Sequence, residues 1–254
     1  MLTEATDKTR IGTVDVPAKI DRERYFRELS YVELSVLFAG PQKASSLAKW
    51  AEVAPPGSLG LAAPFPLTHR KPPAGQKLWA HDDTTGDFRS GDLARATLEP
   101  LREAVKQLTA RCVVFRSPES LSPSAANRDQ LKQFFSEVAT AETIGTERVW
   151  VPGGLWEVRS AVKLANELGV TCAIDPLVHE PGEVVDPYYE LETSALYLRI
   201  VSAGRAGLIR NERLEDLAAL VESYRAQDLR LTVAFASPER WQDARNFLKL
   251  LDAQ

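Results

Sequence analysis

Short apolar strands alternate with amphipathic helices along the whole chain, and this alternation constrains the fold more than any other feature. Strand-and-helix alternation is typical of a parallel sheet, and eight such units close a barrel. The sequence therefore predicts an α/β, TIM-like (β/α)8 barrel that forms one domain over residues 1–254. The eight strands are expected at Arg10–Val14, Tyr31–Phe38, Leu59–Ala63, Arg111–Phe115, Arg148–Val151, Thr171–Ile174, Ala195–Val201 and Arg230–Phe235.

The segments between these strands carry apolar residues at the 3.6-residue period of a helix that packs one face on a sheet. A helix that follows the last strand is expected to begin at Ser237-Pro238, with serine as the N-cap and proline as the first helical residue. The other main helices are expected at Asp21–Leu29, Lys43–Ala51, Leu93–Thr109, around Leu131–Val138, at Trp156–Leu168 and at Glu212–Tyr224.

The composition is that of a protein with a sizeable core, since 44% of the residues are hydrophobic and 26% are charged. The net charge of −4 argues against a partner held by charge alone, such as nucleic acid or a membrane surface. No apolar run approaches the roughly 20 residues that span a bilayer, and residues 1–10 do not resemble a signal peptide. We therefore expect a cytoplasmic protein, with Cys112 and Cys172 as buried free thiols.

Two connections, residues 64–92 and 175–193, are much longer than the others. Each follows a predicted strand, so a barrel would bring both to the face formed by the strand C-termini. Long connections in compact domains usually serve binding, and this face is where barrel enzymes carry their active sites. Trp79, Tyr188 and Tyr189 in these connections are expected either to stack on a ligand or to pin the loops to the barrel.

An ordered set of short motifs resembles the YecE-like family, which is catalogued as domain of unknown function 72 (DUF72). The motifs are Ile11-Gly12-Thr13, Arg24-Tyr25-Phe26, Val32-Glu33-Leu34, Trp50, Pro55-Pro56, Leu67-Thr68-His69, Asp175, Tyr197-Leu198-Arg199 and Val233-Ala234-Phe235 with Asn246. The resemblance covers nearly the whole chain, and the portion from Glu33 to His69 is the most specific. It implies an eight-stranded, TIM-like barrel.

Several polar positions of the family differ in this chain. The resemblance therefore implies a divergent member in which the family's polar pocket is largely lost. Ser35 stands where the family has an asparagine, and no lysine is found near Ala62, where the family has one in its third strand. The other replacements are Trp150–Trp156 for a Glu-Phe-Arg-His-x-Ser-Trp motif, Val201-Ser202 for His-Gly, and Phe235-Ala236-Ser237 for Phe-Asn-Asn.

Glu33, His69, Asp175 and Arg199 form the candidate catalytic or binding set at the barrel mouth. A carboxylate buried in an apolar strand is either a general acid or base with a shifted pKa or one half of an ion pair, for which Arg199 is the expected partner. His69 either transfers protons or binds a metal, or it is hydrogen-bonded so that it holds its loop.

The two long loops also carry groups that could bind a divalent metal, which is the one cofactor that the residues suggest. The ligand candidates are His81, Asp82, Asp83 and His179, together with Asp175 and Glu180. Their spacing matches no metal motif, and a solvated acidic loop is the ordinary explanation for them. The sequence contains no nucleotide-binding glycine motif, nucleophile elbow or Cys-x-x-Cys pair.

Three functions are compatible with these features. The leading hypothesis is a divergent YecE-like barrel that binds a small ligand or a protein partner at the strand C-terminal face. The alternative is a metal-assisted hydrolase of phosphate esters or nucleic acid at the barrel mouth, which rests on fold analogy. A scaffold in a larger assembly would instead show an apolar patch on the outer helices.

Overall fold

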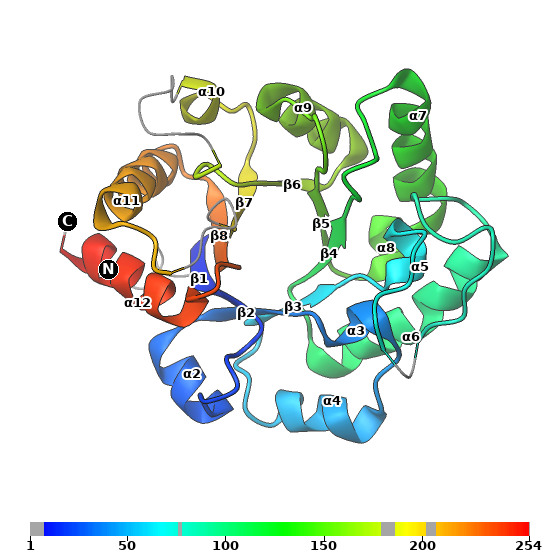
Figure 1. Cartoon of the computed structure of the whole chain (residues 1–254), viewed down its shortest axis with the longest axis horizontal. Coiled ribbons are helices and arrows are strands. Elements are labelled where there is room, and N and C mark those ends of the chain that lie inside the picture. The colour runs from blue at the N-terminus through cyan, green and yellow to red at the C-terminus, as the bar shows by residue number, and fades with distance from the viewer. Residues whose placement is uncertain (1–7, 76–77, 179–185, 202–206, 254) are drawn as a thin grey trace.

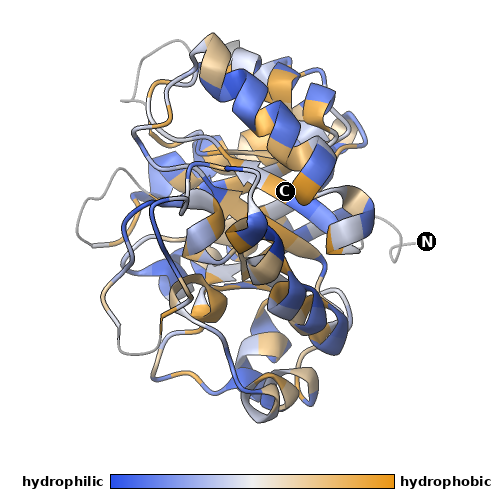
Figure 2. Ribbon diagram, turned by 90° about the vertical axis from the view of Figure 1, so that its right-hand side faces the viewer, coloured by the Kyte–Doolittle hydropathy of each residue, from blue (hydrophilic) through white to orange (hydrophobic). Residues whose placement is uncertain are grey.

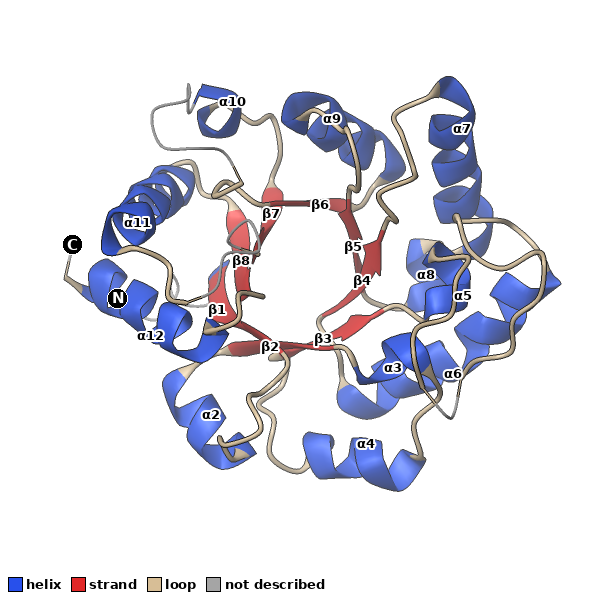
Figure 3. Cartoon of the chain, viewed as in Figure 1, coloured by secondary structure: helices blue, strands red, loops and turns tan. Residues whose placement is uncertain are grey.

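Eight parallel strands form a closed barrel in the computed structural model, which describes residues 8–75, 78–178, 186–201 and 207–253 (Figures 1 and 3). Neighbouring strands pair in chain order, and β8 closes the ring by pairing with β1. The predicted (β/α)8 fold is confirmed. The strands are β1 (Thr9–Val14), β2 (Tyr31–Leu34), β3 (Leu59–Ala62), β4 (Cys112–Arg116), β5 (Glu147–Val151), β6 (Thr171–Ile174), β7 (Ala195–Ile200) and β8 (Arg230–Phe235).

Helices surround this ring and cover the outer face of the strands (Figure 3). Long helices follow β3, β5, β7 and β8, whereas only a four-residue helix is described between β6 and β7. The helices are α2 (Arg22–Glu28), α3 (Val36–Ala39), α4 (Ala44–Ala51), α5 (Phe65–Thr68), α6 (Asp92–Leu108), α7 (Ala125–Gln133) with the π-helical turn η1 (Phe134–Val138), α8 (Ala141–Ile144), α9 (Val158–Leu168), α10 (Asp186–Tyr189), α11 (Asn211–Ala226) and α12 (Arg240–Asp252).

The core has two layers because successive strand residues point to opposite faces of the sheet. One layer fills the space between strands and helices, and the hydropathy colouring in Figure 2 shows the apolar residues on the central strands and the inner sides of the helices. The other layer fills the barrel interior and consists of Tyr31, Cys112, Val114, Val149, Ala173, Tyr197 and Ala234. The barrel interior is therefore a packed core.

Gly60 makes room for the largest of these interior side chains. A Cβ at this position would lie 1.9 Å from Tyr31 Oη and 3.0 Å from Cys112 Sγ. The Tyr31 ring therefore crosses the interior only because β3 carries glycine at this point.

The expected strand Tyr31–Phe38 is too long, because β2 ends at Leu34 and α3 begins at Val36. Ser35 lies between them, and its backbone N–H donates to Asp15 Oδ1 at 2.8 Å instead of to a neighbouring strand. The Ser35 hydroxyl also donates to the Asp15 carboxylate. A side chain from the end of β1 thus ends the strand, which the apolar pattern of Val36–Phe38 does not reveal.

The expected start of the last helix is also wrong. Ser237 does not cap it, since α12 begins at Arg240 and Ser237 donates its hydroxyl to Asp243 Oδ2 at 2.5 Å. Both side chains are fully buried. The serine therefore satisfies a buried carboxylate rather than a helix N-terminus.

The long connection 64–92 is packed against the barrel over most of its described length. Its residues 86–88 donate backbone hydrogen bonds to the carbonyls of Pro66, Leu67 and Thr68. Phe88 is fully buried against Phe134, with ring centroids 5.3 Å apart. Trp79 is buried, and its indole N–H donates to the Leu37 carbonyl at 2.6 Å. Of the two roles expected for this tryptophan, the geometry matches the one in which it holds its loop against the barrel.

Cys112 and Cys172 are buried free thiols, as predicted. In the described part of the chain, no helix combines the length and the apolar character that a membrane span requires.

We expect Gly60→Ala to lower the free energy of unfolding by about 3 kcal/mol or more, because its methyl group would overlap Tyr31. Gly91→Ala is the matched control, since a Cβ at Gly91 meets no atom within 4 Å. Chemical denaturation of both variants measures the difference. Equal stability of the two variants would show that the barrel interior is loosely packed around Tyr31.

Candidate functional site

A cavity of about 580 Å³ opens at the C-terminal mouth of the barrel. It collects residues from the ends of β4, β5, β6 and β7 and from the loop after β3. Three of the four predicted site residues, His69, Asp175 and Arg199, line it, and the fourth lies beneath it. The rest of the lining includes Arg116, Ser117, Glu119, Val151, Pro152, Gly153, Gly154, Trp156, Ala173, Ile174, Val178, Tyr188 and Val201.

Glu33 and Arg199 form a buried ion pair across the barrel interior. Arg199 Nε lies 3.2 Å from Glu33 Oε2, and Arg199 Nη2 lies 3.4 Å from Oε1. The Glu33 side chain is fully buried, and that of Arg199 is 13% exposed. Burial acts to lower the pKa of Arg199, but the Glu33 carboxylate together with Tyr197 and Tyr31 more than offsets this, so the pKa is raised. This geometry matches the ion-pair interpretation of Glu33.

Two tyrosines and a cysteine extend this pair toward the barrel centre. Tyr197 donates its hydroxyl to Glu33 Oε2 at 2.8 Å, and the Tyr31 and Tyr197 hydroxyls lie 3.1 Å apart. Cys112 Sγ lies 3.3 Å from the Tyr31 hydroxyl, and burial raises the pKa of this thiol to about 12. The thiol is therefore neutral at physiological pH and belongs to the packed interior.

His69 stands at the edge of the cavity with one ring nitrogen already engaged. Its Nδ1 lies 2.8 Å from the Thr68 hydroxyl, and its ring packs edge-on against Phe38. Burial lowers its pKa to about 4, and the nearby Arg116 cation adds to this effect. His69 is therefore a neutral imidazole at pH 7 and can exchange hydrogen bonds with a ligand.

Asp175 joins the ends of two neighbouring strands through backbone groups. Its Oδ1 accepts from Leu177 N at 2.9 Å, and its Oδ2 accepts from Val201 N at 2.7 Å. Asp15 makes the equivalent link between the ends of β1 and β2 through Ser35 N. The carboxylates at these two strand ends therefore shape the rim of the barrel.

Arg116 is a site residue that sequence reasoning missed. It ends β4 and lines the cavity, and its guanidinium lies over the Phe38 ring at 4.5 Å. The signal was present, because Cys112, Val114 and Arg116 alternate along β4 as Tyr197 and Arg199 do along β7. The expected strand Arg111–Phe115 ends one residue before Arg116, so this residue was not placed on the strand.

The candidate metal ligands are not gathered into one site in the described part of the chain, where no group of three or more His, Cys, Asp or Glu could hold an ion. The Asp82 Oδ1 atom accepts from Thr84 N and Thr84 Oγ1, and His81 Nδ1 contacts the Trp79 carbonyl. Asp83 is exposed on the same turn. His179 and Glu180 lie outside the described residues.

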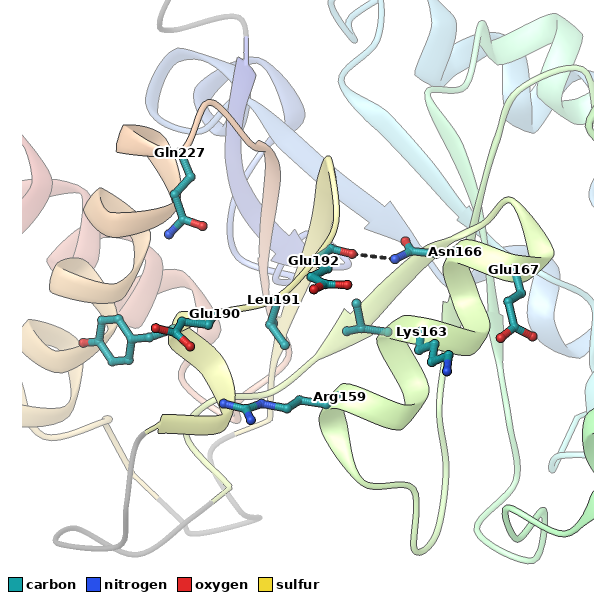
Figure 4. Close-up of a pocket in the computed structure, with 10 residues that line it drawn as sticks. Arg159, Lys163, Asn166, Glu167, Glu190, Leu191, Glu192 and Gln227 are labelled. Carbon is teal, nitrogen blue, oxygen red and sulfur yellow. Dashed lines mark hydrogen bonds between the residues drawn. The ribbon is translucent and has the colours of Figure 1, made fainter.

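A second cavity, of about 840 Å³, is an open groove on the outer wall of the barrel (Figure 4). It runs between α9 and the C-terminal end of α11, beside the segment that leads from α10 into β7. Its polar side chains bond within the wall, since Asn166 donates to the Glu192 carbonyl at 2.5 Å and Glu167 pairs with Lys132 at 3.4 Å. The groove lies away from the strand C-termini.

Known proteins resemble this chain in their folds. The sequence itself matches no protein-family model and no curated protein. A DUF72 family protein from Enterococcus faecalis V583 matches with a TM-score of 0.68 and 12% identity, covering 96% of this chain and 95% of its own. A DUF72 family protein from Thermotoga maritima MSB8 matches with a TM-score of 0.63 and 15% identity, covering 96% and 99%. This chain has the DUF72 fold.

The DUF72 fold is shared with barrels of other names. An AP endonuclease, family 2, from Brucella melitensis matches with a TM-score of 0.57 and 10% identity over 97% of this chain and 98% of its own. Identities this low establish the fold and leave the function to the site. The predicted resemblance to DUF72 proteins is thus confirmed in the architecture.

We expect Arg199→Met to cost about 3–5 kcal/mol of stability, because it leaves the Glu33 carboxylate buried without its cation. The double variant Glu33→Gln with Arg199→Met should recover a large part of this loss, since an amide oxygen still accepts from Tyr197. Urea unfolding of the three proteins tests this expectation. A double variant as unstable as Arg199→Met would contradict it.

His69 should titrate near pH 4, against about 6.5 for an unperturbed histidine, in an NMR pH titration. Its folded-state pKa lies below its unfolded value, so the stability that neutral His69 contributes is complete above about pH 6.5. This stability is lost as the pH falls from about 6.5 to about 4, and His69→Asn should flatten the curve there. Arg116→Met should raise the His69 pKa, whereas a titration unmoved by that change would rule out the coupling.

Proposed function

We propose that this protein binds a small molecule in the cavity at the C-terminal mouth of its barrel. The observation that carries the proposal is that one cavity of about 580 Å³ is lined by His69, Arg116, Asp175 and Arg199 from distant parts of the chain. Ligand pockets are mostly apolar with a few polar groups at defined places, and this cavity has that composition. The protein is thus proposed to be a divergent YecE-like barrel with a binding function.

The distribution of exposed apolar side chains favours the mouth over the outer helices. Among the described residues, none of the large hydrophobic side chains that are exposed lies on a long outer helix. Val178 and Val201 border the cavity, while Val36 and Leu155 follow the ends of β2 and β5. An apolar rim suits a ligand with an apolar body, and it argues against a scaffold that docks through its helices.

The metal-assisted hydrolase has less support. It rests on the fold shared with an AP endonuclease, family 2, and a shared barrel fold does not imply a shared reaction. The described residues contain no group of three ligands that could hold an ion. We therefore propose binding as the function.

A fragment screen followed by methyl NMR tests the proposal. Fragments should shift the methyl signals of Val151, Val178 and Val201 at the mouth and leave those of Val170 and Ala195 at the opposite end unchanged. Val201→Trp should weaken this binding about tenfold or more by filling the cavity. Val36→Trp is the matched control, since Val36 and Val201 are 36% and 39% exposed and only Val201 lines the cavity.

Binding that survives Val201→Trp would place the ligand elsewhere. Shifts confined to Val162 would assign it to the outer wall groove instead. A screen without a single hit at the mouth would refute the proposed function.

A further inference from the structure

One cation at the mouth has no anionic partner within the described residues. Arg116 is half-buried, and its Nε is buried without a hydrogen-bond partner. The Phe38 ring covers one face of the guanidinium, with its centroid 4.5 Å from Cζ. Burial and the neighbouring Arg199 cation lower the pKa of Arg116, and the Glu33 and Asp15 carboxylates, neither of which forms an ion pair with it, act in the opposite direction without cancelling this. A partly buried charge of this kind is costly unless something pairs with it.

The other charges of the cavity are already engaged, apart from the exposed carboxylate of Glu119 at the rim. Arg199 pairs with Glu33 through Nε and Nη2. Both Asp175 oxygens accept backbone N–H groups, and His69 is neutral at pH 7. Glu119 is exposed to solvent at the rim. The cavity therefore offers one unpaired positive charge to a ligand.

The neighbouring helix N-terminus does not share this role. Glu157 caps α9, and its carboxylate accepts from the backbone N–H groups of Arg159 at 2.9 Å and Ser160 at 2.7 Å. An anion in the cavity would find that helix end occupied. The recognition of charge falls to Arg116.

From this arrangement we infer that the ligand is a small monocarboxylic acid with an apolar or ring-shaped body, whose carboxylate pairs with Arg116. A carboxylate matches the flat N–H edge of a guanidinium with two parallel hydrogen bonds. Val151, Trp156 and Val201 would flank the body of the acid. One unpaired charge suits a single carboxylate better than a phosphate dianion. This inference rests on the proposed function and adds the chemical class of the ligand.

Matched pairs of an acid and its amide provide the probe. Benzoate and benzamide, and hexanoate and hexanamide, are titrated into the full-length protein, with inorganic phosphate as a third probe. The wild type should bind each acid about tenfold more tightly than its amide, because a charge-assisted pair is lost in the amide. Arg116→Met should remove this preference. Arg22→Met should keep it, since Arg22 lies over Trp50 on the outside of the barrel.

Thermal unfolding of the unliganded variants separates binding from folding. Arg116→Met should unfold at a temperature equal to or above that of the wild type, because it removes a charge without a partner. A large drop would show that Arg116 is structural and would overturn the inference. Arg116→Lys, which keeps the charge but not the flat edge, should bind the acids more weakly than the wild type.

The outcomes distinguish the two levels of the proposal. Amides that bind at the mouth as tightly as acids would refute the carboxylate and leave the binding function standing. Phosphate that binds more tightly than the acids would assign a different anion and also overturn the inference. If no compound of either kind binds at the mouth, both the inference and the proposed function fail.

Discussion

The buried pair of Glu33 and Arg199 is the interaction on which the mouth of this barrel depends. It joins β2 to β7 across the interior, between residues 166 positions apart in sequence. A carboxylate without exposure is tolerable only with its cation and the Tyr197 hydroxyl in place. The pair also forms the floor of the cavity, so the contacts that join β2 to β7 also shape the surface of the mouth.

Much of this architecture could be predicted from sequence because it depends on local patterns. The alternation of strands and helices implied the barrel, and a charged residue within Tyr31–Leu34 required a partner, which the motif around Arg199 supplied. What failed depended on side-chain hydrogen bonds that lie outside the regular strand and helix patterns. Asp15 ends β2 by accepting a hydrogen bond from Ser35 N, and Asp243 accepts one from the Ser237 hydroxyl. Neither hydrogen bond can be recognised from the spacing of apolar residues.

Most of the candidate site was predicted from the sequence, but the charged residue Arg116 was not. His69, Asp175 and Arg199 were recognised because they stand out by residue type or by resemblance, and the ring closure brings them to one cavity. Arg116 sits at the end of an apolar strand, where arginine is unremarkable until the groups around it are known. The alternation along β4 places Arg116 on the inner face of the barrel, but whether its charge has a partner depends on three-dimensional neighbours that the sequence does not give.

The tyrosine pair in the barrel interior determines whether a small molecule could pass through the barrel. Tyr31, Tyr197 and Cys112 are almost fully shielded from solvent and fill the middle of the ring, with Gly60 admitting the Tyr31 hydroxyl. The barrel is therefore closed below the cavity by its own interior side chains. A molecule that entered at the rim would have to leave by the same route, because these side chains block passage through the barrel.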